Sequence, residues 1–385
     1  MIVRLATPKG YPRSPDHALR CEAMTSAPSA TGSGPLDRED LRQRVQKALN
    51  GFVARQLPTL DAISTELGPL TDALTELISG GKRLRPAFCY WGYRGAGGSD
   101  NDEVVTAAAA LELFQACALI HDDVMDGSDT RRGLPAVHRR FASLHRSQAW
   151  VGDPEGFGMG AAVLLGDLCL AWSDEMLSTC GHTAERLLAG HRVYDEMRTE
   201  LMGGQYLDLL EQARGGGSVE RALRVARYKS AKYTIEKPMH LGAVLAGAGQ
   251  DVLDGYSGYG LPLGEAFQLR DDVLGVFGDP SVTGKPAGDD LREGKRTVLV
   301  AMALETATPA QSAVVRRHLG DPHLTAQGVT ELREVIEQTG ALRRVEDLIE
   351  ELLDDALAAV RAMPVQAQAR EVLEELAVAA TARAL

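Results

Sequence analysis

The sequence has few of the residues that stabilise small secreted or metal-thiolate proteins. Its five cysteines are odd in number and scattered without CxxC spacing, at Cys21, Cys89, Cys117, Cys169 and Cys180. This pattern disfavours a disulfide framework or a zinc site and favours reduced thiols in the cytoplasm. No run approaches the roughly 18 apolar residues of a membrane span, and the first residues lack the apolar core of a secretory signal. We therefore expect a cytoplasmic protein without stable membrane insertion.

Positive charge is also in short supply. The chain has 41 lysines and arginines against 53 aspartates and glutamates, which gives a formal net charge of −12. This balance disfavours a broad basic face for nucleic acid, so we expect no nucleic-acid partner.

Alternating β-branched strands are missing, and the apolar spacing is helical nearly to the end of the chain. The longest helical signals cover residues 103–126, 158–180, 183–213, 219–238 and 258–278. Residues 1–38 mix Pro, Ser, Gly, Thr and Ala without an apolar period, and we expect a disordered leader there. Residues 39–385 are predicted to form one all-α domain, a single large helical bundle.

The first cluster of chemical interest is acidic. Asp122, Asp123 and Asp126 lie at the end of a very apolar helical segment, and Asp122 and Asp126 share one helical face. Their charges repel one another, and the negative end of the helix dipole adds to that repulsion. A bound cation would compensate, and hard oxygen donors point to Mg²⁺. The alternative for such a motif on its own is an ordinary solvated helix end.

A second acidic cluster, Asp271 and Asp272, ends another apolar helical segment and is followed by basic residues. Two acidic helix ends with cations beside them suggest metal ions held between facing helices over an anion, most simply a diphosphate. Further positive charge comes from the segment GGKRLRP at residues 80–86, which is not a Walker motif, and from Arg131 and Arg132.

Five motifs of the sequence resemble the motifs of one protein family. GGKRLRP, HDDVMDGSDTRRG, GQYLDL, YKSAKYTIEKP and FQLRDDVLGVFGDPSVTGKPAGDDLREGKRT are similar, in this order, to motifs of the trans-isoprenyl diphosphate synthases, or polyprenyl synthetases. The resemblance implies an isoprenoid-synthase-type bundle around a central cavity, usually as a homodimer. It also implies a Mg²⁺-dependent, head-to-tail condensation of isopentenyl diphosphate with dimethylallyl, geranyl or farnesyl diphosphate. The product would be a short- or medium-chain trans-polyprenyl diphosphate.

The resemblance also implies roles for individual residues. The implied ligands of three Mg²⁺ ions shared with the allylic diphosphate are Asp122, Asp123, Asp126, Asp271 and Asp272. Cations for the allylic diphosphate are Arg131, Lys229, Lys285 and Lys295, and Lys229 is also assigned to catalysis. Residues for isopentenyl diphosphate are Lys82, Arg85, Gln115 and Arg132. Polar residues near the reacting centre are Gln205, Asp208, Ser230 and Gln268.

One position departs from the family pattern. Gly275 stands where the second motif has its third aspartate. Restoring that carboxylate with Gly275→Asp is expected to lower the Mg²⁺ concentration needed for half activity.

Two other functions remain open at this point. A terpene cyclase shares the helical fold and a DDxxD motif, but its usual NSE motif is absent here and it does not need Lys82 or Arg85. A catalytically silent partner subunit usually loses the aspartate motifs, whereas this chain keeps five of six aspartates.

Product length is expected to depend on the helical segment before Asp122. Cys117 and Ala118 are small where short-chain relatives carry a bulky aromatic residue, and Phe114 lies eight residues before Asp122 on roughly the same face. One helical turn advances about 5.4 Å, close to one isoprene unit. Phe114 therefore predicts a stop at C20, geranylgeranyl diphosphate, with C25 as the next length. The alternative is that Phe114 only packs the core.

Overall fold

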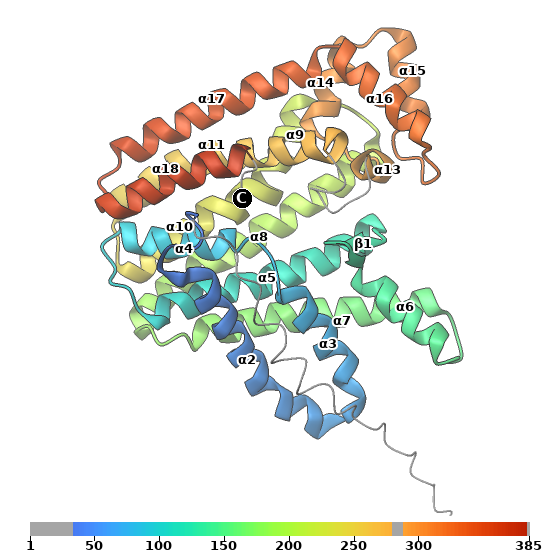
Figure 1. Ribbon diagram of the computed structural model, residues 1–385. Helices are drawn as coiled ribbons and strands as arrows, with labels where there is room; N and C mark the ends of the chain where they lie inside the picture. The colour runs from blue at the N-terminus through green and yellow to red at the C-terminus, as the bar shows by residue number, and fades with distance from the viewer. Residues whose placement is uncertain (1–33, 279–287, 383–385) are drawn as a thin grey trace, which may run out of the picture. The chain divides into compact units, whose positions relative to one another are not determined.

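The computed structural model describes residues 34–278 and 288–382, and the chain from Pro35 onward forms one compact unit (Figure 1). Its helices confirm the predicted all-α class. The first half contains η1 (Arg38–Asp40), α2 (Leu41–Ile63), η2 (Thr65–Leu67), α3 (Gly68–Ile78), α4 (Leu84–Gly95), α5 (Asp102–Asp126), α6 (Val137–Ser147), α7 (Pro154–Ser178) and α8 (Ala184–Arg214). The second half contains α9 (Val219–Val225), η3 (Ala226–Glu236), α10 (Lys237–Ala246), α11 (Gln250–Phe277), α13 (Asp289–Glu293), α14 (Val298–Thr306), α15 (Pro309–His318), α16 (Ala326–Gln338), α17 (Ala341–Ala362) and α18 (Ala367–Ala382).

The predicted boundary between leader and domain stays a prediction, since residues 1–33 lie outside the described ranges. Leu36 is already buried in the core.

Residues 219–238 form more than the single helix that their spacing predicts. The segment divides into α9, the π-helix η3 and the start of α10. A π-helix places its side chains differently from an α-helix, and such turns are frequent at functional sites.

A small antiparallel hairpin follows α5. Its strands are β1 (Thr130–Arg131) and β2 (Leu134–Pro135). The two turn residues, Arg132 and Gly133, both have positive φ, as a type I′ turn requires. Strands of two residues carry no periodic hydrophobic signal, so this hairpin is absent from the sequence-based prediction.

The buried side chains form two clusters. One joins α2, α4, α5, α7, α10 and α18, and the other joins the end of α11 to α13, α14, α16 and α17. Figure 1 shows α14, α15 and α16 grouped together, with α17 running beside α11 and α18. Helix α11, which contributes to both clusters, lines the cavity described below.

Local signals end α5 at the first acidic cluster. The Asn101 side chain accepts a hydrogen bond from the Val104 amide (2.9 Å) and begins the helix. Gly127 adopts a left-handed conformation (φ 67°) and ends it immediately after Asp126. The acidic side chains therefore lie at the C-terminal end of α5, as expected from the sequence.

Candidate active site

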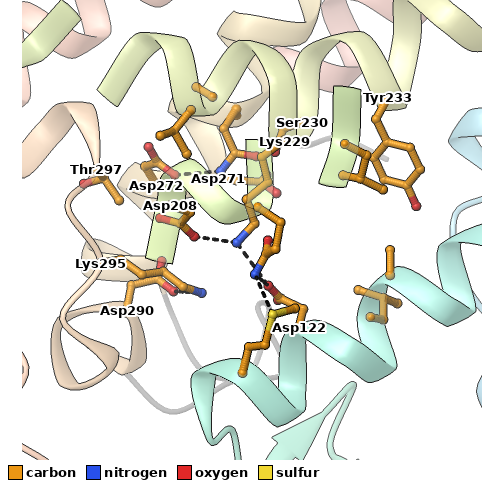
Figure 2. A pocket seen from close by; sticks show the side chains of 18 of the residues that line it. Asp122, Asp208, Lys229, Ser230, Tyr233, Asp271, Asp272, Asp290, Lys295 and Thr297 are labelled. Atoms are coloured by element: carbon orange, nitrogen blue, oxygen red, sulfur yellow. Dashed lines mark hydrogen bonds and ion pairs between the residues drawn. The ribbon is translucent and has the colours of Figure 1, made fainter. Parts of the chain in front are cut away.

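A cavity of about 640 Å³ lies among α5, α8, α9, η3, α11 and the segment 289–297. One part of its wall is polar and includes Asp122, Asp271 and Lys295. Another part is apolar and includes Phe114 and Tyr233. Figure 2 shows Tyr233 on the opposite side of the view from Lys295 and Asp290. Such a cavity can hold a ligand that is charged at one end and apolar along its length.

Asp122 is surrounded by cations and donors from three other elements. Its Oδ1 accepts hydrogen bonds from Lys229 Nζ in η3 (3.0 Å) and from Gln205 Nε2 in α8 (3.1 Å). Its Oδ2 lies 3.4 Å from Arg131 Nη2 in the hairpin. Burial alone would raise the pKa of Asp122, but the charges of Lys229, Lys295 and Arg131 outweigh it and lower that pKa. Asp122 is therefore ionised.

Asp123 and Asp126 have different surroundings although they belong to the same motif. Asp123 is buried and accepts hydrogen bonds from Arg131 Nε (2.9 Å) and Nη2. The Asp126 side chain is 1 % exposed and lies 3.4 Å from Lys295 Nζ, and neither of its oxygens accepts a hydrogen bond. Burial and the charge of Asp122 raise the pKa of Asp126 to about 6. Asp126 is the carboxyl group of this motif whose charge is least compensated.

The second acidic cluster lies on α11 across the cavity. Asp271 and Asp272 both line it, and Gln268 Nε2 donates a hydrogen bond to Asp272 Oδ1 (2.7 Å). Burial, together with the charge of Asp290, raises the pKa of Asp272 to about 7 despite that hydrogen bond. A cation between the two helices would stabilise the ionised form of this carboxyl group.

Lys295 links the first acidic cluster to two carboxylates of the segment 289–297. Its Nζ lies 3.4 Å from Asp126 of the first cluster, 3.4 Å from Asp290 Oδ1 and 2.7 Å from Glu293 Oε2. Glu293 also accepts a hydrogen bond from Ser128 Oγ (2.7 Å), just after α5. The segment that carries Lys295 is therefore attached to the loop that follows the first acidic motif.

Two glycines bring η3 close to its neighbours and so position Lys229 and Ser230 in the cavity wall. A Cβ at Gly204 of α8 would lie 2.5 Å from the Lys229 backbone nitrogen, and a Cβ at Gly264 of α11 would lie 2.6 Å from Ala231 Cα. In this position Lys229 also bonds Asp208 Oδ2 (2.6 Å), so it lies between two carboxylates.

The residues of the GGKRLRP segment divide into two groups. Arg83 has a left-handed backbone and is buried, where it pairs with Glu112 and anchors the segment. Arg85 lines the cavity, donates to Thr234 Oγ1 (2.9 Å) and lies 3.9 Å from the centre of the Tyr233 ring. Lys82 is half-buried and outside the cavity wall.

The structure brings together most, but not all, of the residues expected for substrate binding. Arg132 donates to the carbonyl oxygens of Leu77 (2.9 Å) and Gly80 (3.1 Å) and lines a smaller adjoining pocket of about 210 Å³. Gln115 is half-buried on α5 and lines neither space. Lys285 lies outside the described residues.

Phe114 and Tyr233 belong to the apolar part of the wall, and the buried Tyr194 packs behind Phe114; these three residues are here called the aromatic floor. The Phe114 ring makes edge contacts with Tyr194 (5.6 Å between centroids) and Tyr233 (5.5 Å). Cys117 and Ala118 line the cavity between Phe114 and Asp122. Phe114 therefore packs in the core and also faces the cavity.

Some residues of the site are not evident from the sequence. Tyr194 and Tyr233 come from α8 and η3, and only the tertiary contacts place them beside Phe114. Tyr233 lies four residues after Lys229, which is the one sequence signal that could have suggested it.

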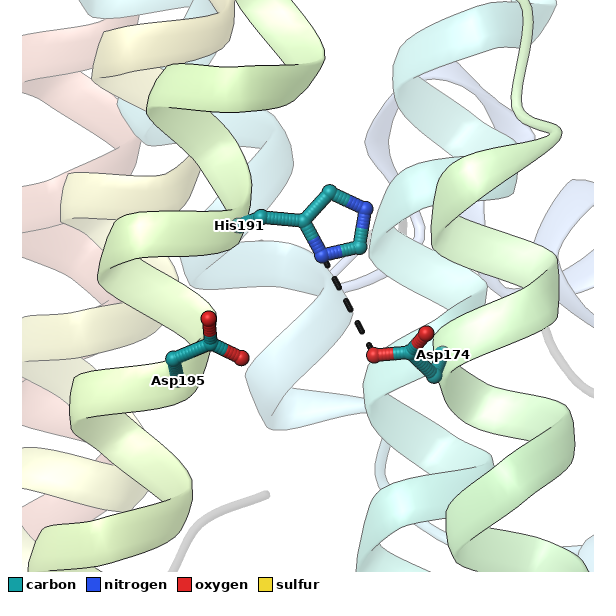
Figure 3. Close-up of side chains that lie close together, drawn as sticks. All are labelled: Asp174, His191 and Asp195. Carbon is teal, nitrogen blue, oxygen red and sulfur yellow. Dashed lines mark ion pairs between the residues drawn. The ribbon is translucent and has the colours of Figure 1, made fainter.

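A second group of potential metal ligands lies outside the cavity wall, between α7 and α8. Figure 3 shows Asp174, His191 and Asp195, whose ligand atoms lie within 4.8 Å of one another. Arg198 bonds both carboxylates, at 3.0 Å to Asp174, and His191 Nε2 lies 3.1 Å from Ser178 Oγ. These contacts account for the group without an ion.

Comparisons with known proteins agree with this geometry. The family model described as polyprenyl synthetase matches residues 68–338. A geranylfarnesyl diphosphate synthase of Aeropyrum pernix is 32% identical over 326 residues, which covers 82% of this chain and 95% of the relative. A geranylgeranyl diphosphate synthase of Saccharolobus solfataricus is 29% identical over 334 residues, which covers 86% and 92%.

A solved structure is similar over nearly its whole length. It is a geranylgeranyl pyrophosphate synthase from Corynebacterium glutamicum complexed with isoprenyl diphosphate and magnesium. It superimposes with a TM-score of 0.87 and 42% sequence identity, covering 89% of this chain and 98% of that one.

Proposed function

The chain belongs to the polyprenyl synthetase family and is a trans-prenyltransferase, and on this premise we propose a specific reaction for it. It condenses isopentenyl diphosphate head-to-tail with an allylic diphosphate and releases diphosphate. The observation that carries this proposal is the cavity that has Asp122 of the first acidic cluster and Asp271 and Asp272 of the second at its polar end, and the rings of Phe114 and Tyr233 at its apolar end. We assign the catalytic domain to residues 39–385.

The donor set of the polar end fits Mg²⁺. The carboxylates come from two facing helices, and both oxygens of the buried Asp126 lack hydrogen-bond donors. We propose that Asp122, Asp123, Asp126, Asp271 and Asp272 hold three ions shared with the allylic diphosphate. When bound, the ions neutralise charge that develops on the departing diphosphate.

Cationic side chains compensate the remaining negative charge of the diphosphate. Arg131, Lys229 and Lys295 lie at the first acidic cluster, where they would face the allylic diphosphate as its C–O bond breaks. The double bond of isopentenyl diphosphate then attacks the allylic carbon, and the released diphosphate accepts the proton that is lost. Arg85 and Arg132, with Lys82 and Gln115, are assigned to isopentenyl diphosphate.

The aromatic floor supports a product near C20. Phe114 lies two helical turns before Asp122, and the small Cys117 and Ala118 leave the first turn open. The relatives from Aeropyrum pernix and Saccharolobus solfataricus are named as geranylfarnesyl and geranylgeranyl diphosphate synthases, names that correspond to C25 and C20 products. We propose geranylgeranyl diphosphate as the main product, with C25 as the next length.

An exposed apolar face supports a homodimer. α5 and α7 are both long and apolar enough to cross a membrane by length and composition, but 72% of the α5 window is buried and only 39% of the α7 window. Exposed apolar residues on α7 and α8 are Phe157, Met159, Val163, Leu164, Leu188, Met202 and Tyr206. We propose that a second copy covers this face and that the dimer is cytoplasmic.

A direct assay tests the reaction. The full chain is incubated with Mg²⁺, labelled isopentenyl diphosphate and dimethylallyl, geranyl or farnesyl diphosphate in turn, and the products are identified. We expect linear trans products with all three primers, ending mainly at C20, and none from the matched variant Asp271→Asn. A cyclic hydrocarbon formed without isopentenyl diphosphate would instead indicate a cyclase. No product with any primer would contradict the proposal and favour a silent partner subunit.

A further inference from the structure

Gly275 of α11 and Asp290 of α13 are in unusually close contact. A Cβ built on Gly275 would lie 1.8 Å from Asp290 Oδ2 and 2.7 Å from its Cγ. At such distances any side chain at position 275 would force the Asp290 carboxylate to move, so this carboxylate occupies the space that a side chain at position 275 would need.

This contact lies in the wall of the main cavity. Asp271, Asp272, Gly275 and Asp290 all line it. Gly275 is four residues after Asp271 on the same helix, so the two positions share a helical face. The resemblance to the polyprenyl synthetases implies a third aspartate at position 275, and in this chain a carboxylate reaches the same space from another helix.

A second observation indicates that a cation belongs beside this carboxylate. Lys295 Nζ lies 3.4 Å from Asp290 Oδ1 and the same distance from Asp126 Oδ2. Asp126 is almost fully buried, and neither of its oxygens has a hydrogen-bond donor. One ammonium group therefore lies between a carboxylate of the first acidic cluster and that of Asp290, and it contacts Asp290 at the oxygen farther from Gly275.

We propose that Asp290 supplies the third carboxylate of the second metal motif, in place of the aspartate that Gly275 has lost. The proposal deepens the proposed function and rests on its Mg²⁺ requirement. It also replaces the expectation for Gly275→Asp, because that side chain would have to displace the Asp290 carboxylate rather than complete an empty position.

The test measures metal binding without turnover. The full chain is titrated with Mg²⁺ in the presence of inorganic diphosphate, and the midpoint is read from the rise in unfolding temperature. We expect Asp290→Asn and Asp290→Ala to raise the midpoint about tenfold, the lower end of the range for lost support of a metal site. Removing a negative charge from a repulsive cluster leaves the metal-free protein folded, which circular dichroism checks.

Moving the carboxylate from position 290 to position 275 tests whether Asp290 binds the metal or only supports the fold. Gly275→Asp alone is expected to leave the Mg²⁺ midpoint no lower than in the wild type and to reduce the unfolding temperature. The double variant Gly275→Asp/Asp290→Ala removes the collision and returns a carboxylate to the same space, so its midpoint is expected to recover to within about threefold of the wild type. The matched control is Asp289→Asn, whose carboxylate pairs with Arg292 in the same helix (3.1 Å) and whose midpoint is expected to stay within about twofold.

The outcomes separate the two proposals. If the wild type shows neither Mg²⁺-dependent stabilisation nor prenyl product, the proposed function fails. If the wild type shows both and Asp290→Ala has the same midpoint as the wild type, only the role of Asp290 is overturned. A double variant whose Mg²⁺ midpoint recovers supports the role of Asp290. A double variant whose midpoint is as high as that of Asp290→Ala overturns it.

Discussion

Individual carboxyl groups in and beside the cavity are kept in different protonation states by their neighbours. Asp122 lies within 3.4 Å of both Lys229 and Arg131 and is ionised. Asp126 and Asp272 are as buried but less compensated, and the pKa of each is raised, to about 6 and about 7. Of these three groups, Asp122 therefore keeps its charge, and the other two gain their charge most easily when a cation arrives.

The raised pKa of Asp272 has a consequence for the metal-free protein. Because that pKa is about 7 in the folded chain and near 3.9 in an unfolded one, the folded state binds the extra proton between these values. Stability from this group is therefore lost as the pH rises from about 4 to 7. Asp272→Asn keeps the acceptor for Gln268 and removes the charge, so we expect it to raise the unfolding temperature at pH 8 by several degrees more than at pH 5.

A matched position on the same helix provides the control. Gln250 Nε2 bonds the exposed Asp254 with the same four-residue spacing as Gln268 and Asp272. Asp254→Asn should have the same small effect at pH 5 and pH 8, measured by thermal unfolding without divalent cations. Equal effects for Asp272→Asn at both pH values would show that Asp272 is not held protonated.

The aspartates could be predicted from the sequence because their spacing alone places them on one helical face. Contacts between elements that are far apart in the sequence could not be predicted in this way. Asp290 has no special spacing from Gly275, and its approach depends on how α13 packs against α11. Tyr194 reaches Phe114 from a helix about 80 residues further on, so no local period reveals it.

At the scale of elements, η3 lies between α8 and α11 because two glycines allow close approach. Gly204→Ala would place a methyl group 2.5 Å from the Lys229 backbone nitrogen and force η3 outward. We expect it to cost about 1–3 kcal/mol of stability. Because Lys229 moves with η3, we also expect turnover to fall roughly 10–100-fold.

The neighbouring Gly203 is a control on the same helix. A Cβ there meets nothing within 4 Å, so Gly203→Ala should stabilise the protein slightly, by about 0.5–1 kcal/mol, and leave turnover unchanged. Denaturant unfolding and steady-state kinetics of the two variants are compared directly. Similar effects of both substitutions would show that the contact with η3 does not position Lys229.

The face of α5 that lines the cavity provides a test of product length. Cys117→Phe adds a ring one turn below Asp122 and is expected to shorten the product toward C15. Phe114→Ala removes one ring of the aromatic floor and is expected to lengthen the product beyond that of the wild type, although Tyr194 and Tyr233 remain. Product analysis by chromatography checks both, and unchanged lengths in the two variants would assign the limit to another wall.

At the scale of the whole molecule, the sequence predicts the helical class and the long helices well because an amphipathic period is a local property. Residues 183–213 are predicted as one helix and α8 is Ala184–Arg214. Two features differ from the prediction because they depend on packing. Helix α11 begins at Gln250, eight residues before the predicted start, and residues 226–236 form a π-helix. The division of the buried side chains into two clusters likewise appears only in three dimensions.

The exposed apolar face of α7 and α8 makes a final prediction about assembly. Leu164 is 66% exposed, although it lies in one of the most apolar helices of the described chain. In a symmetric dimer each substitution acts twice. Leu164→Glu would bury two charges, at a cost of roughly 3 kcal/mol or more, which weakens association at least about 100-fold. We expect light scattering at micromolar concentration to show a shift from twice the chain mass to 41.3 kDa.

The control for this prediction is Ile63→Glu at the end of α2. Ile63 is 71% exposed outside this face, so the substitution should leave the mass unchanged. A wild type that is already monomeric, or a Leu164→Glu variant that remains dimeric, would show that this face does not join the two copies.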